Sequence, residues 1–154
     1  IIRIPMPILF LSHIASTIYM TGLIWFVQVV HYPLHGHVGD IHFAEYQRLH
    51  MNWTSWVVGP PMLIELGTTL LFAAKPPFGL SHWPFIVGAV MLFIVWGSTA
   101  LFQVPFHNAL LNVFDEKAHR NLVWSNWIRT LFWTLRSGLV LYIIYELLQK
   151  IPVE

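Results

Sequence analysis

The stretch QVPFHNALLNVFDEKAHRNLVWSNWIRTLFWTLR, residues 103–136, decides how the chain folds. It places a short charged turn, at residues 115–120, between two apolar runs, and Arg129 and Arg136 follow inside the second run. An arginine inside a hydrophobic helix is costly in lipid, so it should face protein or water and have a partner. We therefore expect the rest of the chain to supply partners for these two side chains.

The composition predicts an integral membrane protein. The 154 residues are 56% hydrophobic and only 10% charged, whereas a soluble domain has about 25% charged residues. Apolar runs at residues 6–30, 53–74, 83–104 and 123–148 approach or exceed the roughly 20 residues that cross a bilayer. The first run is too long for the apolar part of a signal peptide and lacks a cleavage pattern, so we expect it to be retained.

We expect an all-α fold, a four-helix transmembrane bundle that forms a single domain over residues 1–154. The helices are predicted at about 5–31, 41–74, 82–112 and 121–149, with both termini on the same side of the membrane. The short turn at residues 75–79 predicts that the second and third helices are antiparallel neighbours.

The composition also excludes several classes of site. The chain has no cysteine, which excludes disulfides, thiolate metal sites and covalent haem attachment. The net charge is +1 and the few cations lie in turns or inside helices, so no basic face exists for nucleic acid. The expected partners are the lipid bilayer and a lipophilic small molecule.

Prolines and glycines predict where the helices end or bend. Tyr32-Pro33 is expected to end the first helix, because the residue before a proline is pushed out of the α region. The second helix is expected to begin after Gly39, with Asp40 as its N-cap. Gly59-Pro60-Pro61 is expected to bend or loosen that helix, because proline removes a backbone donor.

An internal repeat is suggested by two similar segments. FAEYQRLHMNWTSWV (43–57) and FDEKAHRNLVWSNWI (114–128) share Phe, Glu, Trp and Trp at identical spacing, offset by 71 positions. QVVH (28–31) and QVPFH (103–107) end the first and third helices alike, and the same offset pairs Glu65 with Arg136. This pattern favours two helical hairpins related by a pseudo-two-fold axis along the membrane normal.

The first candidate site lies at mid-membrane depth and contains His13, Glu65 and Arg136. An unpaired charge at this depth costs several kcal/mol, so a Glu65–Arg136 pair is predicted. Two interpretations stay open. One is a proton or ligand site with His13 as the titratable member. The other is a buried ion pair that only fixes the packing of the hairpins.

The second candidate site lies at one mouth of the bundle. It combines three histidines with two polar residues of the last helix: His31, His50, His107, Asn126 and Arg129. These histidines could bind a cofactor, either haem or a metal, with His31 and His107 as the expected ligands. They could equally be interfacial residues bonded to turn carbonyls and lipid headgroups. A third group, His35, His37 and His42, is expected to lie in a mobile loop, as a mobile surface cluster or a weak adventitious metal site.

Two motifs of the second half carry a resemblance to a known family. The motifs are PFHNAL (105–110) and WSNWIR (124–129), which resemble those of small four-helix membrane proteins grouped with anthrone oxygenases. The first half resembles uncharacterised bacterial members of that group, over the run HYPL…VGDIHFAEYQRLHMNW…VVGPPMLIEL. His107 stands where that group is expected to have asparagine. The resemblance implies a four-helix fold with polar residues at one mouth, oxidation of a polycyclic or quinone-like substrate, and a bacterial inner membrane location.

Three functions follow as hypotheses. The leading one is a membrane oxidoreductase or oxygenase-like protein, in which the mouth histidines bind a metal or haem or transfer protons and Arg129 holds an anionic or enolate oxygen. The alternative is a non-catalytic subunit of a respiratory or photosynthetic complex that binds haem, pigment or quinone, or only packs against other membrane subunits. The third is a transporter or channel with His13, Glu65 and Arg136 along its pathway.

Overall fold

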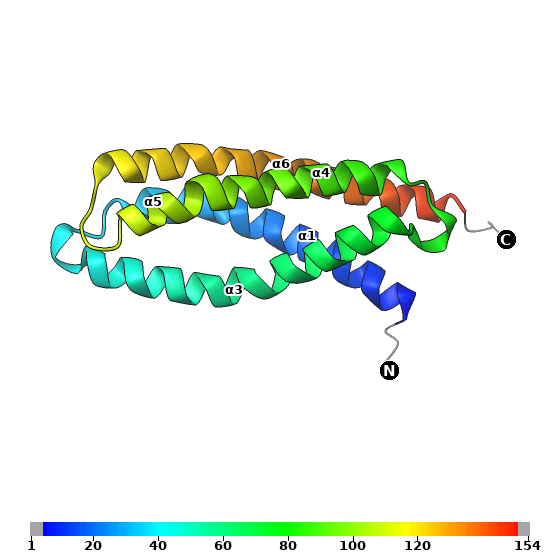
Figure 1. The fold of residues 1–154 in the computed structure, drawn as a ribbon, viewed down its shortest axis with the longest axis horizontal. Coiled ribbons are helices and arrows are strands. Elements are labelled where there is room, and N and C mark those ends of the chain that lie inside the picture. The colour runs from blue at the N-terminus through cyan, green and yellow to red at the C-terminus, as the bar shows by residue number, and fades with distance from the viewer. Residues whose placement is uncertain (1–4, 151–154) are drawn as a thin grey trace.

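The computed structural model describes residues 5–150, and in this range it is an all-α bundle of four long helices without strands (Figure 1). Each helix is long and apolar enough to cross a membrane. The predicted four-helix transmembrane fold is therefore confirmed, and the chain is an integral membrane protein. The four candidate spans are Met6–His35, Asp40–Ala74, Trp83–Ala109 and Glu116–Leu148.

The four spans are built from the following elements. The first contains α1 (Met6–Phe26), a π-helical turn (Val27–His31) and α2 (Tyr32–His35). The second is α3 (Asp40–Ala74), which a 3-10 turn at Pro77–Gly79 follows. The third contains α4 (Trp83–Ser98), a π-helical turn (Thr99–Gln103) and α5 (Val104–Ala109), and the fourth is α6 (Glu116–Leu148).

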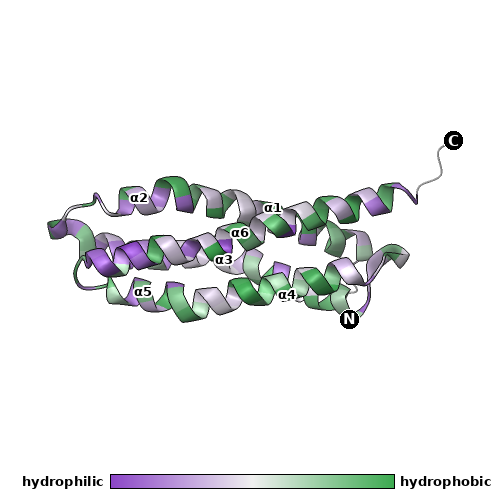
Figure 2. Cartoon of the chain, turned by 90° about the horizontal axis from the view of Figure 1, so that it is seen from above, coloured by the Kyte–Doolittle hydropathy of each residue, from purple (hydrophilic) through white to green (hydrophobic). Residues whose placement is uncertain are grey.

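The helices form a closed ring in which sequence neighbours are antiparallel. α1 packs against α3 and α6, and α4 packs against α3 and α6. α1 begins and α6 ends at the same end of the bundle (Figure 1). Hydrophilic residues gather toward the opposite end, where α2 and α5 lie, and hydrophobic residues run along α4 (Figure 2). Large apolar side chains such as Leu11, Leu63 and Leu101 point outward, as lipid contact requires.

The first helical span continues through Tyr32-Pro33, so the predicted end there is wrong. A proline inside an α-helix clashes with the carbonyl four residues back. The π-helical turn before Pro33 avoids this clash by widening the helix, with the Tyr32 N–H bonded to the Val27 carbonyl. The third span repeats the arrangement before Pro105, where the Val104 N–H bonds to the Thr99 carbonyl. A π-helical turn thus precedes a proline in both spans, at positions 72 apart.

Three other helix boundaries differ from the prediction. The N-cap of α3 is Gly39, whose φ of 83° favours glycine, and Asp40 is the first helical residue. The third span ends at Ala109 rather than at 112. α6 begins at Glu116 rather than at 121, because the Asp115 side chain accepts a hydrogen bond from the Ala118 N–H and caps it. The predicted bend at Gly59-Pro60-Pro61 fits Figure 1, where unbroken α3 changes direction near its middle.

The predicted Glu65–Arg136 ion pair is confirmed at the centre of the bundle. Arg136 Nη2 lies 3.0 Å from Glu65 Oε1, and the two side chains are 2% and 0% exposed. Thr17 donates to Oε1 at 2.8 Å and Trp133 Nε1 donates to Oε2 at 3.0 Å. Arg136 also donates to the Gly88 carbonyl. The pair therefore connects all four spans.

His13 lies next to this ion pair but bonds to a different residue. Its Nδ1 lies 3.0 Å from Thr68 Oγ1, and its ring packs edge-on against Phe72. The space bounded by His13, Gly88 and Arg136 is only about 10 Å³, which is at most one water molecule. This geometry favours the packing interpretation of the set over a ligand site. It also argues against a transport pathway through Glu65 and Arg136.

The ion pair predicts an asymmetry between single and double replacements. Glu65→Leu should lower the free energy of unfolding by about 3–5 kcal/mol, because it leaves the Arg136 guanidinium buried without a carboxylate. The double variant, Glu65→Leu with Arg136→Met, should lower the free energy of unfolding by clearly less than Glu65→Leu alone, because both charges are removed. Unfolding in mixed detergent micelles would measure both. A double variant less stable than the single one would contradict the assignment.

Candidate functional site

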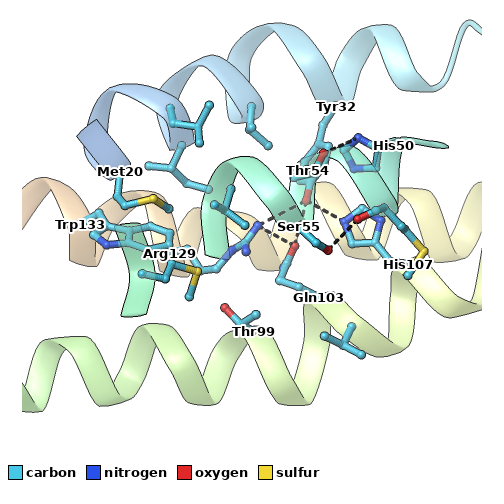
Figure 3. Close-up of a pocket in the computed structure, with 17 residues that line it drawn as sticks. Met20, Tyr32, His50, Thr54, Ser55, Thr99, Gln103, His107, Arg129 and Trp133 are labelled. Atoms are coloured by element: carbon cyan, nitrogen blue, oxygen red, sulfur yellow. Dashed lines mark hydrogen bonds between the residues drawn. The ribbon is translucent and has the colours of Figure 1, made fainter. Parts of the chain in front are cut away.

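A cavity of about 170 Å³ lies among the four spans at the level of the two π-helical turns (Figure 3). We call it the Arg129 cavity. Its two ends differ in character. One end is apolar and is lined by Met20, Leu23, Ile24, Val58, Met62 and Trp133. The other end is polar and is lined by Tyr32, His50, Gln103, His107 and Arg129. The cavity therefore suits a molecule with an apolar body and one polar edge.

The π-helical turns supply two buried glutamines that support the polar end. Gln28 Oε1 accepts a hydrogen bond from Asn126 Nδ2 at 2.8 Å. Gln103 Nε2 donates to Ser125 Oγ at 2.7 Å, and Gln103 Oε1 accepts from the Tyr32 hydroxyl at 3.2 Å. Each glutamine thus joins a proline-containing span to α6. Our site prediction omitted both glutamines and Tyr32, although a glutamine near a proline in an apolar helix was a usable signal.

Arg129 is held entirely by neutral groups. Its Nη2 donates to Asn126 Oδ1 at 2.5 Å, to Gln103 Oε1 at 3.2 Å and to the Tyr32 hydroxyl at 3.3 Å. Among residues 5–150 the one salt bridge is Glu65–Arg136, so no described carboxylate neutralises Arg129. Nη1 makes no hydrogen bond within the same residues. Figure 3 shows the guanidinium pointing into the cavity. The polar end thus carries a net positive charge.

Gln47 connects two histidines and sets which of their nitrogens carries a proton. Gln47 Nε2 donates to the His107 carbonyl at 2.8 Å, so its Oε1 must be the atom that faces His35 Nε2 at 2.9 Å. His35 therefore carries a proton on Nε2. Gln47 Nε2 also lies 3.2 Å from His107 Nδ1, which accepts. The proton of neutral His107 is then on Nε2, which faces the Tyr32 hydroxyl at 3.1 Å.

His50 is the cavity histidine with a ring nitrogen available to a ligand. Its Nδ1 lies 3.1 Å from Thr54 Oγ1, while Nε2 has no hydrogen bond within residues 5–150. His50 also borders a second space of about 180 Å³ between α1 and α3, which we call the lateral groove. Both spaces are bounded by Leu23, Val27, His50, Thr54 and Val58.

The structure brings the predicted mouth residues close together but does not place the two expected metal or haem ligands, His31 and His107, on a common space. His50 stacks on His31 with 4.5 Å between ring centroids, and His107 lies 5.2 Å from His50 on the cavity side. His31 borders the lateral groove and His107 borders the Arg129 cavity, so the two expected ligands do not face a common space. Within residues 5–150 no three His, Asp or Glu side chains are grouped to hold a metal ion.

The prediction that His35 belongs to a mobile surface cluster is wrong. His35 is fully buried against Phe43 and bonded to Gln47, because the helix continues through Pro33 and turns this side chain inward. His37 and His42 are exposed, as expected. Pro33 and Pro105 are 72 positions apart, as are His35 and His107, so buried His35 and half-buried His107 each follow a proline by two residues.

Trp133 is the residue that joins the two predicted sites. Its ring lines the apolar end of the Arg129 cavity, and its Nε1 donates to Glu65. His13, Glu65 and Arg136 themselves do not line the cavity. They form a separate, deeper set, and the hydrogen bond from Trp133 to Glu65 holds one wall of the Arg129 cavity in place.

Comparison of the chain with protein-family models, with curated proteins and with solved structures found no match. The function is therefore argued from the geometry of the site.

Gly36 allows His119 to approach the histidine cluster. His119 Nε2 donates to the Tyr32 carbonyl at 2.9 Å, and a Cβ on Gly36 would lie 3.0 Å from His119 Cε1. Gly36→Ala should therefore displace the ring and destabilise the protein by about 1 kcal/mol, the usual contribution of one hydrogen bond.

The matched control is Gly22→Ala, because a Cβ there meets nothing within 4 Å and alanine is the better helix former. Thermal unfolding and the NMR signals of isotope-labelled His119 would compare the two variants. Equal melting temperatures and an unmoved His119 signal would contradict the contact.

Proposed function

We propose that the Arg129 cavity binds a lipophilic, quinone-like or polycyclic molecule with an ionisable oxygen, and that the protein is a membrane-embedded, oxygenase-like oxidoreductase acting on it. The observation that carries this proposal is the unneutralised Arg129 guanidinium at the polar end of an apolar cavity. A cation held by neutral groups attracts an anionic oxygen, and the surrounding low dielectric strengthens that attraction.

The size of the space supports an aromatic ligand. An engineered apolar cavity of about 150 Å³ holds one benzene molecule, so the Arg129 cavity of about 170 Å³ holds about one ring. A larger polycyclic molecule, or one with a tail, would extend into the lateral groove, which adds about 180 Å³ and shares Leu23 and Val58 with the cavity. Such a molecule would enter from the bilayer between α1 and α3.

The arrangement supports activation of a ring ketone by removal of a proton. The proton leaves the carbon of a ring methylene for Nε2 of His50, and the electron pair of that C–H bond is delocalised to the ketone oxygen. Arg129 then holds the enolate oxygen, while Asn126 fixes the guanidinium from behind. Dioxygen is the oxidant: one ring methylene and one dioxygen give one carbonyl and one water.

His107 has a positioning role in this proposal. Its Nδ1 accepts from Gln47 and its Nε2–H faces the Tyr32 hydroxyl, so neither nitrogen is free to take a proton from the ligand. His107 instead fixes the Tyr32 hydroxyl, which lies beside Gln103 Oε1 and Arg129. This division of roles makes His50 the expected base.

The proposal is tested by removing the charge of Arg129. We expect Arg129→Gln to weaken binding of a dihydroxyanthrone probe by about 10- to 100-fold, because a hydrogen bond to a charged group contributes about 1.5–3 kcal/mol. Oxygen uptake with this probe should fall by at least as much. The protein would be tested in lipid nanodiscs, by fluorescence titration and an oxygen electrode.

Arg120→Gln is the matched control, because Arg120 is an exposed arginine in the charged turn. Unchanged binding in Arg129→Gln would overturn the proposed site. Arg129-dependent binding without oxygen uptake above the protein-free rate would overturn the catalytic part and leave a binding protein, as a subunit of a respiratory or photosynthetic complex would be.

A further inference from the structure

Histidine rings form a continuous row from the Arg129 cavity to the end of the bundle that carries the charged turn. The rings of His50 and His35 have centroids 5.7 Å apart, and those of His35 and His119 are 5.4 Å apart. His31 lies beside this row, 4.5 Å from His50 and 5.9 Å from His35. His119 is half-buried and is near exposed Glu116, so the row reaches the surface.

We propose that His50, His35 and His119, with His31 beside them, conduct protons between the Arg129 cavity and the aqueous end of the bundle. This inference rests on the proposed function for the source of the proton, which is the bound molecule. The path itself is a property of the histidine row, and it can be measured without any ligand.

Two buried nitrogens without partners support the path. Within residues 5–150, His31 Nε2 and His35 Nδ1 are buried and make no hydrogen bond. An unpaired buried polar atom costs about 1–3 kcal/mol, so its presence requires a reason. The His35 ring lies between His50 and His119, and the His31 ring lies beside His50 and His35. Because His35 carries its proton on Nε2, its Nδ1 has a lone pair and is a ready acceptor.

The fixed hydrogen bonds let a proton pass without permanent rearrangement. The proton moves from His50 to Nδ1 of His35, directly or through Nε2 of His31. Each transfer requires a ring motion that brings the two nitrogens together, because His31 Nε2 and His35 Nδ1 have no hydrogen bond within residues 5–150. The same proton then moves to Nδ1 of His119, whose Nε2–H stays on the Tyr32 carbonyl. Release to water restores each neutral ring with its original tautomer. Because His35 takes up and gives up the proton at the same nitrogen, its ring must turn between the two transfers and then return to Gln47.

The carboxylate near the row is exposed Glu116, at its outer end beside His119, and no histidine of the row forms a salt bridge with a carboxylate within residues 5–150. The other titratable groups that face these rings are Tyr46 of α3, Tyr32 of α2 and His107 of α5, with Arg129 of α6 as the fixed cation nearby. The one salt bridge within residues 5–150 is remote from the row. A proton on the inner rings of the row, His50, His35 and His31, therefore has no bonded carboxylate within residues 5–150 to hold it in place.

The path is tested by the exchange of the His50 imidazole N–H with water. Protein with isotope-labelled histidine, in nanodiscs and without ligand, would be measured by NMR. We expect His35→Phe and His119→Phe each to slow this exchange at least about tenfold, and the double variant to be no slower than the slower single variant, because the steps are in series. His42→Phe, an exposed histidine outside the row, is the control.

The direction of the change separates conduction from a structural role. A variant that only loosened the bundle would admit water and speed up His50 exchange, whereas a broken path slows it. Unchanged or faster exchange in both variants would overturn the proposal. If His35→Phe does not fold, the rate of His50 exchange in His119→Phe still tests the proposal, because His119 is only half-buried. If binding of the anthrone probe did not depend on Arg129, the proposed function would be overturned. The measurement of His50 exchange would still test the proton path, because it needs no ligand.

Discussion

The ion pair of Glu65 and Arg136 is the interaction on which the packing of the bundle depends. Charges at this depth cannot be solvated by lipid, so each must find its partners within the protein. Thr17, Trp133 and the Gly88 carbonyl complete the hydrogen bonds of the pair and draw in every span. Displacement of α3 or α6 would separate the two charges, and displacement of α1 or α4 would remove a hydrogen bond from one of them. The position of each helix is thereby set at the centre of the bundle.

The two arginines of α6 are used in opposite ways. Arg136 is neutralised by a carboxylate in a region with almost no free volume, which is the arrangement of a structural contact. Arg129, two helical turns earlier, is surrounded by amides and a hydroxyl and faces a cavity. Its charge is therefore available to an external anion. Because Trp133 contacts both regions, the structural pair holds the wall against which a ligand would lie.

The site is made possible by two π-helical turns that no simple proline rule predicts. Each turn widens a helix just before a proline and lets it continue for one more turn. In the first span this extra turn brings Tyr32 and His35 into the interior, and in the third span it brings His107. Had the first helix ended at Tyr32, His35 would lie in a loop and Gln47 would have no second histidine to bind.

The sequence by itself determined the membrane class, the number of helices and the need for a Glu65–Arg136 pair. These follow from apolar run lengths and from the cost of an isolated charge in lipid, and both can be read from composition and order. Tertiary structure alone decided which of the other polar groups meet. The pairing of Gln47 with His35 and His107, and the absence of a described carboxylate near Arg129, depend on how helices distant in sequence are rotated and packed. Apolar patterning is nearly uniform around these helices, so it does not specify that rotation, whereas the buried hydrogen bonds do.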